Sequence, residues 1–334
     1  MTKRPLPLVL LLLLSNYCYA VESNDEREAP SYRELMIKNT LVPGLGMSRL
    51  GNKEEARIYY LALPLRLTGA GLAAAAVFLY GNSIVAEIER RDGATRLFGY
   101  KYELSAASRL MLLGGTGLTL YGSLLASYSN YAVHSDYVSR YGLPEGAAGR
   151  AQPRISMAAV LAAPFTPAHV LTLDVLPIIG LSTLSGFSIE DYGNMGGYFR
   201  RDRVRFLGYD VKPFTGLGLQ ILLACGFVTA NAAWEELAYR GLGLQLSGAT
   251  HSSLSFGFAH LANMFLPGVT VEGALLQTLT ATAFGFYAAD RVQREENGLE
   301  RMIALHFWNN LLAWVLGYLA DPESDRIFSI AVRF

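Results

Sequence analysis

The stretch that decides the fold is an uncharged run, GLGLQILLACGFVTA (residues 216–230), followed directly by NAAWEELAYRG (residues 231–241). Together with its flanks, the run approaches the ~20 apolar residues that a helix needs to cross a bilayer. Three charged residues, Glu235, Glu236 and Arg240, stand at its end. Charges in such a setting are costly unless they are paired or used. The stretch therefore predicts a membrane helix that ends in a polar site.

The composition extends the membrane interpretation to the whole chain. Of the 334 residues, 51% are hydrophobic and only 17% are charged, against the roughly 25% that is usual in soluble domains. Lys+Arg and Asp+Glu both number 28, so no charge excess favours nucleic acid as a partner. We expect an all-α, polytopic transmembrane helical bundle whose partner is the lipid bilayer.

The N-terminus has the layout of a secretory signal peptide. Lys3 and Arg4 precede a short apolar core, and Ala20 follows it. The core is too short to span a bilayer as a helix. Residues 1–20 are therefore predicted to be a cleaved signal peptide, with an uncleaved anchor as the alternative. The expected location is an integral membrane position in a bacterial inner (plasma) membrane.

The rest of the chain divides into two predicted regions. Residues 21–200 carry a polar tail, a turn at the Pro-Gly-Leu-Gly of 43–46, and about two to three transmembrane segments. Residues 201–325 carry the polar motifs. A polar loop is expected at 134–154. The predicted apolar spans lie at about 59–80, 106–130, 155–187 (interrupted by prolines), 213–238, 251–267, 271–290 and 303–320.

The first polar cluster is Glu235-Glu236-x-x-x-Arg240. On a helix, residues four apart can pair, so Glu236 has Arg240 as a partner while Glu235 points about 100° away. A carboxylate without a counter-ion in a dry site accepts a proton more readily, which suits a general base. An ion pair at the end of a helix is the simpler alternative.

Two further clusters lie on later apolar spans. His260 has Phe256 one turn before it and Asn263 three residues after it. His306 and Asn310 are four residues apart and therefore share one helical face. Both of these last side chains can donate hydrogen bonds, and two donors on one face could hold a developing oxyanion. A hydrogen-bonded core histidine is the alternative interpretation of His260.

The order and spacing of these motifs resemble those of the CPBP family, the type II CAAX prenyl proteases and bacteriocin-processing or immunity enzymes also called the Abi family. The resemblance covers about residues 210–320 and includes Glu-Glu-x-x-x-Arg, Phe-x-x-x-His and His-x-x-x-Asn. It implies an intramembrane endopeptidase that hydrolyses peptide bonds of membrane-associated peptides or proteins.

The resemblance also assigns a role to each motif residue. Glu235 would activate the water and His260 would assist it, while His306 and Asn310 would bind the oxyanion. Supporting roles fall to Glu236, Arg240, Phe256 and Asn263. The cofactor is left open, because Glu235, His260 and His306 could hold a divalent metal such as zinc, and a metal-free mechanism is equally consistent.

Two other functions are compatible with such a chain. One is a non-catalytic membrane scaffold or immunity protein that retains the protease fold. The other is a proton-coupled transporter that uses buried Glu and His residues. The transporter is less favoured, because the two halves of the sequence show no matching interrupted helices.

Overall fold

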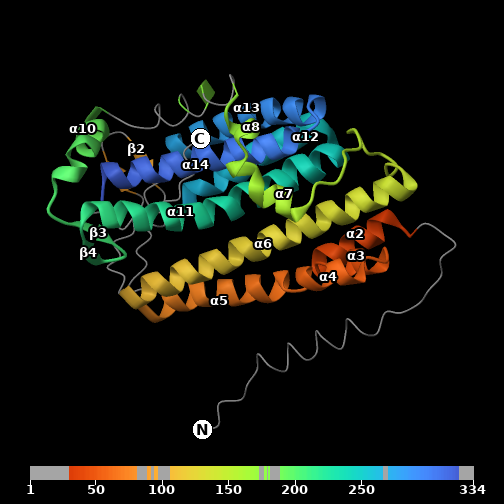
Figure 1. Ribbon diagram of the computed structural model, residues 1–334, viewed down its shortest axis with the longest axis horizontal. Coiled ribbons are helices and arrows are strands. Elements are labelled where there is room, and N and C mark those ends of the chain that lie inside the picture. Colours follow the sequence, from red (N-terminus) through yellow and green to blue (C-terminus); the bar gives the residue numbers. More distant parts are fainter. Residues whose placement is uncertain are drawn as a thin grey trace, which may run out of the picture.

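The computed structural model describes residues 30–80, 89–91, 94–96, 106–172, 177–178, 180, 189–265 and 270–322. The predicted signal peptide lies outside these residues. The all-α helical bundle is confirmed, since the strands of the described part form only two short antiparallel hairpins (Figure 1).

The N-terminal elements are α2 (Tyr32–Leu41), α3 (Leu45–Arg49), α4 (Lys53–Tyr59), α5 (Ala62–Tyr80), β1 (Glu89–Arg91), β2 (Ala94–Arg96) and α6 (Ala106–Tyr141). The connecting elements are α7 (Met157–Ala162), η1 (Ala163–Phe165), α8 (Pro167–Val170), α10 (Ile189–Gly197), η2 (Tyr198–Arg200), β3 (Val204–Phe206) and β4 (Tyr209–Val211). The C-terminal elements are α11 (Pro213–Glu236), the π-helix η3 (Leu237–Gly243), α12 (Leu244–His260), η4 (Leu261–Phe265), α13 (Val271–Arg294) and α14 (Gly298–Ala320).

Four stretches of the described chain are long and apolar enough to cross a membrane: Lys53–Ala76, Ala107–Tyr141, Pro213–Met264 and Gly298–Ala320. The third includes both α11 and α12 and therefore covers two of the predicted spans. Large apolar side chains are exposed on the outer faces of these helices and of α13, which fits contact with lipid. They include Leu67, Leu110, Leu222, Phe258, Leu276 and Leu279.

Helices α5 and α6 form a close antiparallel hairpin that lies along the C-terminal helices (Figure 1). The contact depends on glycine. A Cβ on Gly69 would lie 2.5 Å from the carbonyl oxygen of Gly115, and a Cβ on Gly115 would lie 2.6 Å from that of Gly69. Small residues let membrane helices approach closely, where packing replaces the hydrophobic effect as the source of stability. The two glycines therefore set the spacing of the hairpin.

Replacing Gly115 with Ala is expected to lower the free energy of unfolding by about 1–3 kcal/mol, the usual cost of overpacking. Its neighbour Gly114 provides a matched control, because a Cβ there meets nothing within 4 Å. Thermal unfolding of the two purified variants in the same detergent would check this. Equal stability of the two variants would contradict the glycine contact.

Two predicted segments differ from the structure. The loop expected at 134–154 begins later, because α6 continues to Tyr141. The polar side chain of His134 is fully buried there against other helices, and tertiary hydrogen bonds satisfy it. The apolar region predicted at 155–187 forms the short helices α7, η1 and α8 over its first part, because Pro164 and Pro167 interrupt a continuous helix.

The predicted turn at Pro43-Gly44-Leu45-Gly46 is confirmed and is held by one buried amide. Gly44 has a φ of 96° and caps the N-terminus of α3, which follows α2 after this turn. The side-chain oxygen of Asn39 accepts hydrogen bonds from the backbone N–H of Gly44 at 3.0 Å and of Gly46 at 2.9 Å. The Asn39 amide nitrogen donates to Asn130 on α6 at 2.8 Å. The N-terminal helices are thus fastened to α6.

A chain of hydrogen bonds continues from these N-terminal helices to the segment after the Glu pair. The Tyr32 hydroxyl lies 2.7 Å from Nδ1 of His134, and the other ring nitrogen lies 3.3 Å from the side-chain oxygen of Gln245. The Gln245 amide donates to the carbonyl oxygen of Gly241 at 2.6 Å. Because Gly241 belongs to the π-helix, the N-terminal region helps to position the helix turn that carries Arg240.

Candidate active site

The helix that carries the Glu pair changes its hydrogen-bonding pattern immediately after it. Residues Leu237–Gly243 form a π-helix, in which each N–H bonds to the carbonyl five residues back. Such segments are rare and are often found at functional sites. Gly241 lets the turn pack on a neighbouring ring, since a Cβ there would lie 2.9 Å from Tyr131. Within this π-helix, Arg240 remains close to Glu236.

The predicted pair of Glu236 and Arg240 is present and fully buried. One guanidinium nitrogen of Arg240 donates to Oε1 of Glu236 at 3.3 Å, and both side chains are 0% exposed. The guanidinium also lies over the ring of Phe256, with its central carbon 3.8 Å from the ring centroid. A desolvated cation over an aromatic face gains stability from the ring quadrupole. Phe256 therefore supports Arg240 as well as lining the cavity described below.

His306 lies between the two glutamates. Its Nδ1 is 2.8 Å from Oε1 of Glu236, and its Nε2 is 3.7 Å from Oε2 of Glu235. Since an ionised carboxylate can only accept, the Nδ1 atom carries the hydrogen of the contact with Glu236. Glu236 thus orients the imidazole, as carboxylates do in catalytic triads. This second role of Glu236 was not part of the prediction from sequence.

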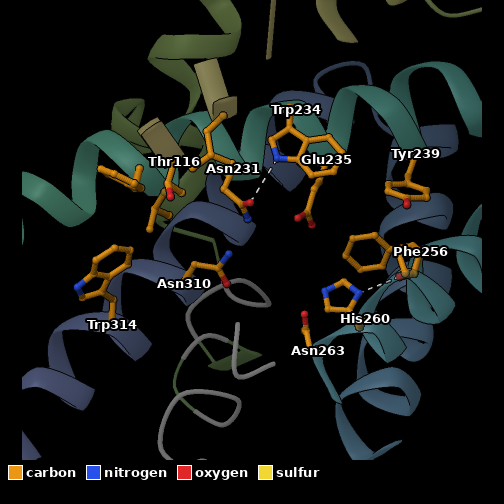
Figure 2. A pocket seen from close by; sticks show the side chains of 14 residues that line it. Thr116, Asn231, Trp234, Glu235, Tyr239, Phe256, His260, Asn263, Asn310 and Trp314 are labelled. Carbon is orange, nitrogen blue, oxygen red and sulfur yellow. Dashed lines mark hydrogen bonds between the residues drawn. The ribbon is translucent and has the colours of Figure 1, made fainter. Parts of the chain in front are cut away.

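Glu235 faces a cavity of about 290 Å³ (Figure 2). Its Oε2 is buried and accepts no hydrogen bond from the described residues. His260 also lines the cavity, and its Nδ1 donates to the carbonyl oxygen of Phe256 at 2.8 Å. That bond leaves Nε2 as the acceptor of a neutral ring, and Figure 2 shows the ring reaching into the cavity.

Four of the predicted site residues other than Glu235 line the same cavity. They are Phe256, His260, Asn263 and Asn310. Asn263 is held by a hydrogen bond of 2.8 Å from its amide to Gln277 on α13. His306, Glu236 and Arg240 are buried behind this surface. The remaining lining residues are Thr116, Leu120, Phe227, Val228, Asn231, Trp234, Tyr239, Ala259 and Trp314.

Sequence reasoning missed two contributions to this cavity. Asn231 lies one turn before Glu235 on α11, and Figure 2 shows it beside the carboxylate and opposite Asn310. An amide one turn from a buried glutamate in an apolar run was the available signal. Thr116 and Leu120 come from α6, outside the segment with the motifs. No pattern in the sequence places them there, because the contact depends on how distant helices pack.

The site does not fit the metal alternative. Among the residues that the structure describes, no group of three or more His, Cys, Asp or Glu side chains is arranged so that it could hold a metal ion. A tetrahedral zinc site needs at least three such protein ligands around one point. The reaction steps below therefore use only the side chains.

No protein-family model matches the chain, and no match is found among the curated proteins or the solved structures. The interpretation of the site therefore depends on the motifs and on their geometry in this structure.

Proposed function

We propose that the protein is an intramembrane endopeptidase of the CPBP type, which hydrolyses peptide bonds of membrane-associated peptides or proteins. The observation that supports this most is the convergence of Glu235, His260 and Asn310 on one cavity within a bundle of apolar helices. Polar groups inside a membrane bundle are costly and commonly mark a functional site. The proposal also explains why charged residues follow the uncharged run at residues 216–230. The carboxylate of Glu235 would activate a water molecule that enters the cavity.

In the proposed reaction, Glu235 takes a proton from water, and the resulting hydroxide attacks the carbonyl carbon of the scissile peptide bond. His260 accepts a hydrogen bond from the same water through Nε2 and orients it. The carbon–nitrogen bond then breaks, and the proton held by Glu235 passes to the leaving amine. Positioned general bases of this kind contribute typically 10²–10⁴-fold to a rate.

The developing oxyanion needs hydrogen-bond donors across the cavity from Glu235. The amide of Asn310 supplies one donor on the cavity wall. Such preorganised donors are usually the largest single source of rate enhancement. His306 does not line the cavity; its Nε2 lies 3.7 Å from Oε2 of Glu235, so its part in the proposed reaction is to position that carboxylate.

The function is tested by reconstituting the protein in liposomes with membrane-anchored peptides of mixed sequence in H₂¹⁸O. New C-termini that carry one ¹⁸O atom, detected by mass spectrometry, are the expected result of attack by water. Absence of any cleavage by the folded parent protein would overturn the proposal in favour of a non-catalytic scaffold. Proton flux without cleavage would favour the transporter.

Replacing His260 with Gln is expected to reduce cleavage by about 10²-fold, the lower end of the range for acid–base groups. The reason is that the variant keeps a polar side chain but loses the ring nitrogen that orients the water. His251 lies on the same helix and is exposed, so His251→Gln is the matched control and should cleave like the parent. Equal rates for both variants would remove His260 from the mechanism.

A further inference from the structure

We infer that the site, if it acts as proposed above, selects substrates with a large apolar side chain, such as Leu or Phe, next to the cleaved bond. The compartment that receives this side chain is defined by Thr116, Leu120, Phe227, Val228 and Trp314, and is called the apolar compartment below. Its outer wall comes from α6, in the region that precedes the motifs. The inference rests on the proposed function and adds a substrate preference to it. Two residues of α6, Thr116 and Leu120, would help to set that preference.

The apolar compartment is continuous with the catalytic groups and lies one helix turn away from them. Phe227 precedes Asn231 by four residues on α11, and Trp314 follows Asn310 by four residues on α14. One such step along a helix is about 6 Å. Figure 2 shows Thr116 and Trp314 on one side of the cavity and His260 on the other, with Asn310 between them.

The walls of the apolar compartment carry two hydrogen-bonding groups, the Thr116 hydroxyl and the Trp314 indole N–H, and are otherwise apolar. The rings of Phe227 and Trp314 lie with their centroids 6.0 Å apart and close one end. Binding sites for organic ligands share this design, in which apolar walls surround a few placed polar groups. A charged or strongly polar substrate side chain would lose more hydration there than these two groups replace, so the compartment favours an apolar one.

The size of the cavity sets the upper limit on that side chain. An engineered apolar cavity of about 150 Å³ admits benzene. The cavity here measures about 290 Å³, so it has room for one ring or branched aliphatic group together with the peptide group and a water. The volume therefore matches selection at one position of the substrate.

Helix α6 is held firmly enough to act as a wall. The Tyr121 hydroxyl donates to the carbonyl oxygen of Gly226 on α11 at 3.0 Å. A Cβ on Gly117 would lie 3.5 Å from the ring of Phe227, in ordinary van der Waals contact. The hydrogen bond and this close approach lie next to Leu120 and Thr116 in the sequence. These two side chains therefore keep a fixed distance from α11, as a specificity wall requires.

The test compares cleavage of two anchored peptides that differ only in having Phe or Ala beside the cleaved bond. Leu120→Trp fills the apolar compartment and is expected to shift the ratio of kcat/KM values toward Ala by about 10–200-fold, the range for apolar pockets that lose or gain a group. Leu110→Trp is the matched control, since Leu110 is on the same helix and 51% exposed. An unchanged ratio in an active Leu120→Trp variant would overturn the inference.

A binding measurement separates this inference from the proposed function. Trp314 lines the apolar compartment, so a peptide with bromophenylalanine at the selected position should quench its fluorescence, and an alanine peptide should not. The measurement uses the Glu235→Gln variant, because binding can then be observed without cleavage of the peptide. Quenching without cleavage by the parent protein would refute the protease and keep the compartment. Trp234 also lines the cavity, so a Trp314→Phe variant assigns the signal. Cleavage without quenching, or equal quenching in the Trp314→Phe variant, would refute the compartment and keep the protease.

Discussion

Glu235→Gln is expected to abolish peptide cleavage, with a loss of about 10²–10⁴-fold, while the protein stays folded and membrane-inserted. The substitution keeps the shape of the side chain and removes the group that accepts the proton of the water. Stability should change little, because glutamine keeps the shape of the side chain and Oε2 of Glu235 accepts no hydrogen bond from the described residues that the substitution would break. Cleavage rates and thermal unfolding of the purified variant would check both parts.

The two measurements together make the assignment specific. A loss of activity accompanied by a loss of stability would point to a structural role for Glu235 instead of a catalytic one. Full activity of Glu235→Gln beside a stable, inactive Glu236→Gln would reverse the roles of the two glutamates.

Glu236→Gln is expected to have the opposite effect, with a loss of about 3–5 kcal/mol in the free energy of unfolding. Glu236 is the buried counter-ion of Arg240 and also accepts the hydrogen bond from His306. Without it, the guanidinium of Arg240 keeps its charge in a site that is 0% exposed, because arginine cannot release its proton in proteins. Chemical unfolding in detergent is the appropriate measurement.

A second, exposed pair with the same spacing provides the control. Asp290 and Arg294 on α13 are also four residues apart, 2.7 Å from each other, but 46% and 77% exposed. Asp290→Asn should therefore cost at most about 1 kcal/mol. The double variant Glu236→Gln, Arg240→Met should recover much of the lost stability, since an apolar replacement of a buried pair is often neutral. Equal costs for the buried and exposed pairs would contradict this account.

The sequence was sufficient to predict the helical class, most of the apolar helices and the pairing of Glu236 with Arg240. Each depends on a local signal, such as the length of an uncharged run or a spacing of four residues. The turn at 43–46 was equally local, because proline and glycine limit the backbone there. The structure also brings Glu235, His260 and Asn310 to one cavity, which the order of the motifs suggested.

The features that the sequence did not reveal are all set by tertiary packing. The π-helix after Glu236 has the same residue types as an ordinary helix, so its hydrogen-bonding pattern leaves no periodic trace. Helix α6 extends past the expected boundary because His134 finds partners on Tyr32 and Gln245, far away in the sequence. The cavity wall formed by Thr116 and Leu120 likewise depends on the packing of helices that are distant in the sequence.

Helix α14 follows the other described helices in the sequence, and this order matters for how the protein is made. A chain is synthesised from its N-terminus at about 5–20 residues per second, so Glu236 and Arg240 enter the membrane seconds before His306 exists. Until then the buried charges lack one of their hydrogen-bond partners, and the cavity lacks the wall that bears Asn310. A chain that stops before Gly298 is therefore an incomplete membrane protein with poorly compensated charge, a state that cellular quality control removes. The candidate site is complete only once α14 has been made.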